Sequence, residues 1–240
     1  MQVAYTLGKS IDDISDSLGV LVNDSAGQQN PSDNRDNRGP SQFDVRQRLV
    51  IAHVWEPTWA RNISNGLVRR LLDGFGFAGI SSFQGGFPAT FETGARRGIA
   101  PLSLTGGANV HRPNAAGPVN FEPIPSGRND ARSALNADPI QRISQYAAAI
   151  GLSQPFIGNF GNIGRNVSRL NGLVNFDWNV YKNISVTERV RVQLRAEFYN
   201  TFNNTSFSGA QLTISSPQFG QYSRTEYNQR NMQVGARVIF

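Results

Sequence analysis

The sequence contains no cysteine, so disulfide bonds, thiolate metal sites and cysteine nucleophiles are excluded. It has only two histidines, His53 and His111, and no pattern of partner residues accompanies either of them. A catalytic triad or a histidine metal cluster is therefore not expected. No apolar run approaches the roughly 20 residues that a transmembrane helix requires. Any segment that crosses a membrane must accordingly be a strand.

Apolar residues are also scarce. They make up 39% of the 240 residues, against about 45–50% in soluble domains, although that range counts glycine. Together with 24 glycines, this composition favours a one-layer wall with a wet inner face over a thick core. Met1 is not followed by the basic and apolar segments of a signal peptide. We expect the later part of a longer exported protein, the alternative being a soluble chain.

The net charge is +6, and arginine greatly outnumbers lysine. Nucleic acid and anionic lipid or lipopolysaccharide phosphate are both possible partners of such a charge. No dense basic run with interleaved aromatic residues is present, so nucleic acid is not expected as a partner.

Two stretches, 190–199 and 231–240, alternate apolar with more polar residues, as strands with one apolar face do. The apolar members are Val190, Val192, Leu194, Ala196 and Phe198 in the first stretch, and Met232, Val234, Ala236, Val238 and Phe240 in the second. Each stretch is longer than a typical strand of about five or six residues. Ten residues is close to the length of roughly 9–11 that a tilted strand needs to cross a bilayer.

The chain contains six such candidate strands, at 1–9, 43–55, 75–83, 172–181, 190–199 and 231–240. The faces of 43–55 cannot be assigned, because its centre, Leu49 to Ala52, is apolar on both sides. Six strands cannot enclose a membrane barrel, for which about eight is the minimum. The predicted fold is all-β, an incomplete antiparallel transmembrane β-barrel segment that belongs to a larger barrel or to an oligomer.

The expected connections alternate in length. Outer-membrane barrels have short periplasmic turns and longer extracellular loops. We therefore expect 10–42, 84–170 and 200–229 outside the cell, and 56–73 and 182–188 in the periplasm. Ser64 is a candidate cap for a short helix that ends before Gly74, and Asp138-Pro139 is a candidate start for a helix that ends at Gly151.

Several blocks carry a family resemblance: YTLGKSIDD, FDVRQRLVIAHVWEP, FAGISSFQGGFPATF, GNFGNIGRN, NFDWNVYKNISVTERVRVQLRAEFYNTFNNTSF and MQVGARVIF. They resemble the C-terminal portion of TonB-dependent outer-membrane receptors, within them the Oar-like subfamily with a carboxypeptidase-regulatory-like domain, common in Acidobacteria. The blocks extend over nearly the whole chain, while the loops between them match nothing recognisable.

The resemblance implies a 22-stranded barrel, closed by an N-terminal plug and energised by TonB through a box ahead of the plug. On that expectation the plug, the TonB box, the regulatory-like domain and the first strands lie outside this chain, and TonB would act only through them. The expected location is the bacterial outer membrane, with its lipid, lipopolysaccharide and barrel-assembly machinery as partners. The resemblance also implies a barrel-assembly signal, which falls on Met232, Val234, Ala236, Val238 and Phe240.

The main candidate site is the polar face of 190–199. Its charged and polar residues, Arg191, Gln193, Arg195 and Glu197, are expected to face the lumen, since arginine facing lipid costs roughly 2–4 kcal/mol near the midplane. They could contact a substrate, but pairing with the plug or with neighbouring strands is the favoured role. Aromatic residues near expected periplasmic strand ends suggest an interfacial girdle. They are Trp55, Trp59, Trp178 and Tyr181.

Other motifs favour structural roles. The G-x-G-x-x-G match at 74–79 lies inside an aromatic strand and lacks the strand-to-helix setting of a dinucleotide site. Two groups of acidic residues lack calcium-binding spacing and are expected to be solvated: Asp12, Asp13 and Asp16, and Asp33 and Asp36. We expect no cofactor, no metal and no enzymatic activity. Two alternatives to a receptor remain open: a stand-alone oligomeric outer-membrane pore, and a soluble secreted β-sandwich that binds a surface ligand.

Overall fold

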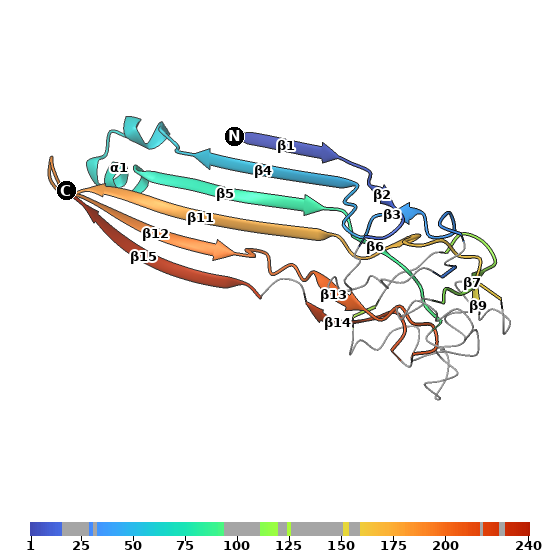
Figure 1. The fold of residues 1–240 in the computed structure, drawn as a ribbon. Helices are drawn as coiled ribbons and strands as arrows, with labels where there is room; N and C mark the ends of the chain where they lie inside the picture. The colour runs from blue at the N-terminus through green and yellow to red at the C-terminus, as the bar shows by residue number, and fades with distance from the viewer. Residues whose placement is uncertain are drawn as a thin grey trace.

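The structure, a computed structural model, describes residues 1–15, 29–30, 33–93, 111–119, 124–125, 151–153, 159–216, 218–225 and 229–240. Its main element is a six-stranded antiparallel sheet, here called the wall, with strand order β1-β4-β5-β11-β12-β15 (Figure 1). Its strands are Gln2–Leu7 (β1), Gln47–Trp55 (β4), Phe75–Gln84 (β5), Leu173–Ser185 (β11), Arg191–Tyr199 (β12) and Asn231–Ile239 (β15). All six predicted strands are confirmed. The sheet is open, with β1 and β15 as its two edges.

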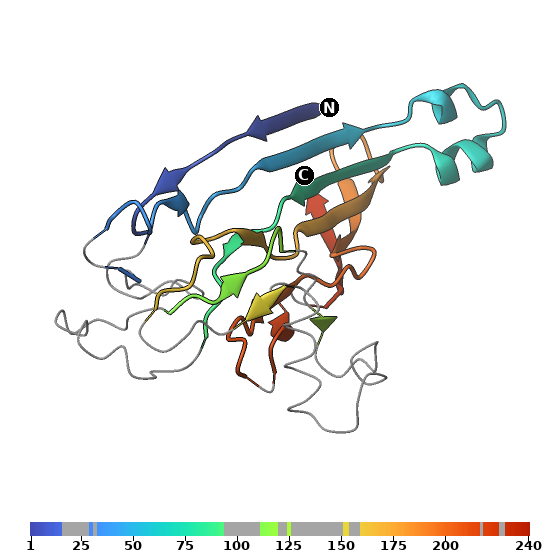
Figure 2. The same cartoon turned by 90° about the vertical axis from the view of Figure 1, so that its right-hand side faces the viewer.

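The connections between wall strands gather at two ends (Figure 1). The described parts of the connections 8–46, 85–172 and 200–230 lie at one end, which we call the loop end. Residues 56–74 and 186–190 lie at the opposite end, the turn end. The predicted alternation of long and short connections is therefore confirmed. Figure 2 shows the same separation, with the helical segment of the turn end far from the mass of the loop end.

The second wall strand begins later than predicted. We expected it from position 43, but β4 starts at Gln47. The backbone before it makes a turn, in which the Asp44 N–H donates to the Ser41 carbonyl at 2.9 Å. The Asp44 carboxylate in turn accepts a hydrogen bond of 2.7 Å from the Ser10 backbone N–H. These polar contacts replace the hydrogen bonds of a strand at this point.

The fourth wall strand is longer than predicted. It continues to Ser185, four residues past the expected end at Tyr181. The hairpin then closes in the segment 186–190, where the Val186 N–H donates to the Val190 carbonyl at 2.9 Å. Register with β12 is continuous from Trp178 onward, and this pairing holds the extra residues in the strand.

The first predicted helix is confirmed, with its cap moved by one residue. Helix α1 spans Gly66–Leu72, preceded by the 3₁₀ helix η1 at Trp59–Asn62. Its N-cap is Asn65, whose side-chain oxygen accepts from the N–H groups of Leu67 (3.0 Å) and Val68 (3.3 Å). The second predicted helix, from Asp138-Pro139 to Gly151, falls on 138–150, outside the described residues. Within the described part of the chain, no helix is long and apolar enough to cross a membrane.

The register sorts every wall residue onto one of two faces, because residues directly opposite in neighbouring strands point the same way. Arg195 lies opposite Tyr181 of β11 and Gly235 of β15, and these belong to the polar face. The apolar face carries alternate residues of β12 and β15, including Ala196 and Val234.

Pairing with β5 also resolves the two faces of β4, whose apolar centre left them unassigned. Ile51, His53 and Trp55 lie on the apolar face, opposite Ser81, Gly79 and Phe77 of β5 respectively. Their neighbours Val50, Ala52 and Val54 lie on the polar face.

Two glycines of β5 are covered by aromatic rings from β11. A Cβ added to Gly76 would lie 2.2 Å from Cζ of Tyr181, on the polar face. A Cβ added to Gly79 would lie 2.3 Å from Cδ1 of Trp178, on the apolar face. The ring positions require residues without side chains, so the G-x-G-x-x-G match belongs to a strand, as expected. Gly74, which precedes the strand, has φ +83°, a left-handed conformation that favours glycine.

The buried apolar core lies at the loop end rather than on the wall. Its residues are Ala89, Phe91, Leu152, Ile163, Ala210, Leu212, Ile214, Phe219 and Tyr222. Short strands organise this end: Ile11–Asp12 (β2), Gly39–Pro40 (β3), Pro88–Ala89 (β6), Asn114–Ala115 (β7), Ile124–Pro125 (β8), Leu152–Ser153 (β9), Ser168–Arg169 (β10), Phe207–Ala210 (β13) and Gln221–Thr225 (β14). They pair as β2-β3, β6-β10, β7-β9 and β13-β14-β8. The described parts of the long loops therefore form a folded unit.

Candidate functional site

A network of hydrogen bonds runs along the polar face of β12. The guanidinium of Arg195 donates to Oε1 of Glu197 at 3.1 Å and to Oε1 of Gln193 at 3.2 Å. These partners are two residues away in either direction, the spacing at which side chains share a face. The network is partly open to solvent, since the Arg195 side chain is 47% exposed and that of Glu197 19%.

Side chains from both neighbouring strands join this network. Glu197 accepts hydrogen bonds from the hydroxyl of Tyr199 at 3.0 Å and from Nε2 of Gln233 in β15. Gln193 donates from Nε2 to Oδ1 of Asn183 in β11 at 2.9 Å. The polar side chains thus hold β11, β12 and β15 together across the face, in addition to the backbone hydrogen bonds of the sheet.

A broad hollow of about 580 Å³ lies over the polar face beside this network. Its lining residues come from strands β1 to β12. The polar ones include Gln2, Asp177, Asn179, Glu197 and Tyr199. Carboxylates, amides and a phenol over a largely apolar floor are suited to binding a polar organic ligand by hydrogen bonds. The described residues offer no group of three or more acidic or histidine side chains placed to hold a metal ion.

The four residues predicted to share a polar face do so. Three of them, Gln193, Arg195 and Glu197, belong to the network. Arg191 lies opposite Ser185 and Ile239 at the turn end. Within the described part of the chain, its side chain makes no hydrogen bond or ion pair.

The aromatic residues predicted for a girdle do not form one group. Trp55 and Trp178 lie on the apolar face, and Trp59 lies in η1. Tyr181 instead lies on the polar face, where its hydroxyl donates to Oε1 of Glu56 at 2.6 Å. Trp178 is near the middle of β11 rather than at its end, because the strand continues to Ser185. The strand-end placement is therefore wrong for Trp178, whereas Tyr181 lies opposite Gly76, the second residue of β5, near the turn end.

The apolar members of the last strand lie together on the apolar face of the edge strand β15. Met232, Val234, Ala236 and Val238 lie opposite Phe198, Ala196, Leu194 and Val192 of β12. Phe240 follows the strand and is 98% exposed. On the same apolar face, further along the wall, the rings of His53 and Trp178 make a T-shaped contact, with centroids 5.8 Å apart.

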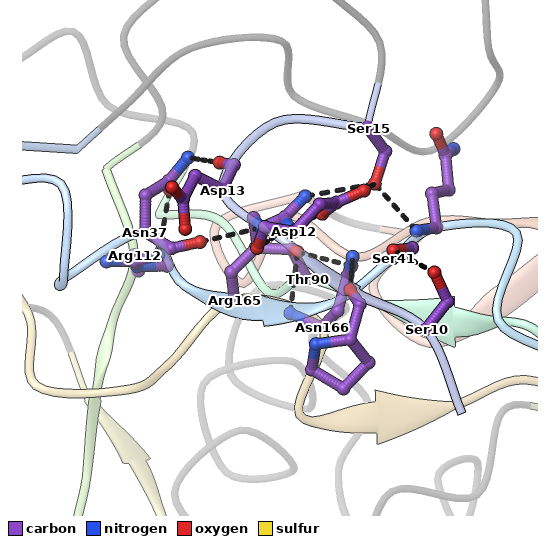
Figure 3. Close-up of polar contacts among 12 residues, drawn as sticks. Ser10, Asp12, Asp13, Ser15, Asn37, Ser41, Thr90, Arg112, Arg165 and Asn166 are labelled. Carbon is purple, nitrogen blue, oxygen red and sulfur yellow. Dashed lines mark hydrogen bonds and ion pairs between the residues drawn. The ribbon is translucent and has the colours of Figure 1, made fainter.

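The loop end contains a second polar cluster that sequence reasoning missed (Figure 3). Arg165, with a side chain only 3% exposed, pairs with the carboxylate of Asp12 and donates to the Asp12 carbonyl at 2.7 Å. Its Nε also donates to the Asn37 carbonyl at 2.9 Å. One side chain therefore holds two separate parts of the first connection.

Two further arginines of the second long connection make similar contacts with the first. Arg112, with a side chain 1% exposed, pairs with Oδ2 of Asp36 at 2.6 Å and donates to the Asp36 carbonyl at 2.9 Å. Arg169 pairs with the carboxylate of Asp44 and donates to the Asp44 carbonyl at 3.0 Å. The expectation that the acidic residues at 12 and 36 are solvated is thus wrong for Asp12 and Asp36. The two residues of each arginine–aspartate pair lie more than 70 positions apart in sequence, so no local sequence pattern predicts the pairing.

These ion pairs predict an acid-sensitive loop end. Burial alone would raise the pKa of Asp12 and Asp44, but hydrogen bonds to Arg165 and to Ser10 and Arg169 respectively lower it below the ordinary value of 3.8. A lowered carboxyl pKa contributes stability that is complete above 3.8 and is lost as the pH falls through the folded-state pKa.

We therefore expect amide hydrogen exchange at β2 and β3, corrected for the intrinsic rate, to accelerate below pH 3.8, and that of β11 and β12 to change less. Equal acceleration in both regions, or none at the loop end, would contradict this role for the two carboxylates.

Comparison with known proteins agrees with this geometry. A family model described as an outer membrane beta barrel domain matches residues 1–233. No curated protein and no solved structure matches the chain. The match, together with the open antiparallel wall, identifies an incomplete transmembrane β-barrel segment located in the bacterial outer membrane. Since the matched segment covers almost the whole sequence, the chain belongs to the outer membrane beta barrel domain family.

Proposed function

We propose that this chain is part of the barrel wall of a TonB-dependent receptor of the Oar-like type, which takes up a ligand across the outer membrane with energy supplied through TonB. One observation carries the proposal: the wall is an open, single-layer sheet with a charged network on one face and apolar side chains on the other. Such a sheet suits a segment of a barrel much larger than six strands. The proposed role is transport without catalysis, and the plug and the contact with TonB would come from segments outside this chain.

In this proposal the polar face lines the lumen. Arg191, Gln193, Arg195 and Glu197 would then face the plug or a passing ligand, while the apolar face contacts lipid. The alternative orientation would place Arg195 in hydrocarbon near the strand centre, at a cost of roughly 2–4 kcal/mol. The hydrogen bonds of Arg195 within the wall favour a structural role for it over substrate contact.

The proposed orientation places the loop end outside the cell and the turn end in the periplasm, since outer-membrane barrels have their long loops outside. The lipopolysaccharide leaflet would then surround the loop end. Trp55 and Trp59 lie near the turn end, where aromatic rings favour the membrane interface.

Matched arginine substitutions test which face contacts lipid. Ala196 lies on the apolar face at the centre of β12, between Val180 and Val234. We expect Ala196→Arg to reduce the free energy of unfolding by about 2–4 kcal/mol, measured by urea titration of the protein in bilayers. Ala52→Arg, the same change on the polar face at the centre of β4, is the control and should cost much less. Equal losses for the two variants would argue against lipid contact on the apolar face.

The end of the chain is proposed to be read by the barrel-assembly machinery. Phe240 and the apolar face of β15 are exposed and form one continuous strip at the edge of the wall. We expect Phe240→Ala to lower the amount of full-length receptor inserted in the outer membrane, measured by heat-modifiable gel mobility of membrane fractions. Gly235→Ala is a control at the polar face, because its Cβ would meet nothing within 4 Å. Normal insertion of the Phe240→Ala variant would show that Phe240 is not part of a barrel-assembly signal.

The remaining alternative is a pore made of several copies of this chain. The soluble β-sandwich alternative is wrong, because the family places the chain in the outer membrane and no second sheet covers the apolar face among the described residues. Reconstitution of the chain alone distinguishes the pore from the receptor. A stable oligomer that conducts ions across planar bilayers supports the pore and argues against the receptor. An incomplete wall without conductance, together with an upstream reading frame that encodes a plug, supports the receptor.

A further inference from the structure

The turn end carries a helical segment whose apolar residues are exposed. In α1, Leu67 is 77% and Leu71 68% exposed, and none of its residues is buried. At 100° per residue, the four apolar side chains of the helix occupy an arc of about 140°. They are Leu67, Val68, Leu71 and Leu72. The two arginines, Arg69 and Arg70, occupy the rest of the circle, so this short helix is amphipathic.

A lysine of the wall places the end of this helix on the apolar side of the sheet. Lys182 lies opposite Phe75 in the register, and both belong to the apolar face. Its ammonium group donates to the carbonyls of Arg70 at 3.1 Å, of Leu71, and of Asp73 at 3.3 Å. It also lies 4.3 Å from the centroid of the Phe75 ring. The cation thus stabilises the C-terminal end of α1 at the margin of the lipid-facing surface.

Among the described residues, the basic side chains of the helix have no protein partner. In the part of the chain that the structure describes, neither Arg69 nor Arg70 makes a side-chain hydrogen bond or an ion pair. Arg61 of η1, by contrast, pairs with Asp73 at 3.6 Å and ties η1 to the end of α1. The exposed Trp59 in η1, 56% exposed, adds an aromatic ring of the type enriched at membrane interfaces.

We propose that η1 and α1 form an interfacial foot, which lies in the membrane boundary at the turn end and binds the headgroups of anionic phospholipids. The contacts of Lys182 place the C-terminal end of α1 beside the apolar face of the wall, and Arg69 and Arg70 supply charge complementary to phosphate. Helices with an apolar face and a basic face lie in this position on membranes. The foot does not depend on transport, so its failure would leave the proposed receptor function intact.

Site-specific labelling tests the location of the foot, because the chain has no cysteine of its own. An environment-sensitive dye on Leu71→Cys in the full chain, reconstituted in phospholipid vesicles, should be quenched by lipids brominated near the headgroup. Aqueous iodide should quench it poorly. The same dye on Glu188→Cys, in the exposed turn of the other hairpin, should show the reverse pattern. Iodide quenching of both dyes alike would overturn the proposal, and so would shielding of the Leu71 dye from both quenchers, which indicates cover by protein.

Lipid charge tests the headgroup part of the inference. At equal mole fraction, brominated phosphatidylglycerol should quench the Leu71 dye more than brominated phosphatidylcholine does. Each arginine near an anionic surface should contribute about fivefold to the preference, so Arg69→Gln with Arg70→Gln should nearly abolish it. Equal quenching of the Leu71 dye by the two lipids, in the labelled chain that keeps both arginines, would overturn headgroup binding. Unchanged heat-modifiable mobility of all variants shows that the barrel segment is still folded.

Discussion

Replacing Arg165 by leucine is expected to unfold the loop end locally. Its guanidinium is almost fully buried and binds both the carboxylate and the carbonyl of Asp12, as well as the Asn37 carbonyl. Leucine would remove the Arg165 donors from both carbonyls and the cation from the carboxylate, which would keep its hydrogen bonds from the Ser15 hydroxyl. Removing one partner of a buried pair costs about 3–5 kcal/mol, and we expect the lower end, since Asp12 is 24% exposed and can recover some hydration.

Hydrogen exchange of the amides in β2 and β3 measures this loss. Arg61→Leu is the matched control, because the pair of Arg61 with Asp73 has exposures of 63% and 37% and should contribute at most about 1 kcal/mol. Adding Asp12→Leu to Arg165→Leu should restore part of the protection, since no unpaired charge then remains. If Arg165→Leu reduces the amide protection of β2 and β3 no more than Arg61→Leu does, the buried pair does not hold the loops together.

Phe91→Ala should reduce the stability of the loop end as much as Arg165→Leu does, but by a different mechanism. Phe91 is fully buried, and its ring lies 6.1 Å from that of Phe219, centroid to centroid. Truncating a buried phenylalanine typically costs 3–5 kcal/mol, because apolar contacts are lost and a cavity remains. The contact joins the second long connection to the third, so β13 and β14 should lose protection together.

Phe43→Ala provides the control for the same chemical change. Phe43 is 57% exposed in the first connection, and its truncation should have a small effect. The two variants are compared by hydrogen exchange and by chymotrypsin cleavage after Phe219. Cleavage there should become faster only in Phe91→Ala. Equal effects of the two substitutions would mean that the loop end has no cooperative apolar core.

The wall could be predicted from sequence because its signal is local. In β12 and β15, alternation with a period of two appears within ten residues and needs no knowledge of neighbours. The faces of β4 could not be predicted in the same way. Leu49, Val50, Ile51 and Ala52 are all apolar, and only pairing with β5 decides which of them faces which side.

The loop end could not be predicted, because its contacts are distant in sequence. Arg165 and Asp12 are separated by 153 positions, and each looks like an ordinary loop residue in its own segment. The polar composition of the long connections indicated solvated loops. In the structure, their few apolar residues, such as Phe91 and Phe219, come together, and the buried arginines satisfy the polar groups around them. The polar network of β12 could be predicted in part. The alternation of β12 identifies the strand, but only the register of β11 and β15 identifies Asn183 and Gln233 as its partners.

Burial of the arginine–aspartate pairs at the loop end has a consequence for ionic strength. Salt screens exposed charges over about 10 Å at 0.1 M and over about 3 Å at 1 M, but it acts much less on buried or partly buried pairs. The side chains of Arg112 and Arg165 are almost completely shielded from solvent. The shape of the loop end should therefore change little between fresh and saline water. For a surface that faces the cell exterior, as proposed, this keeps the geometry of the loops constant in a medium whose salt content the cell does not control.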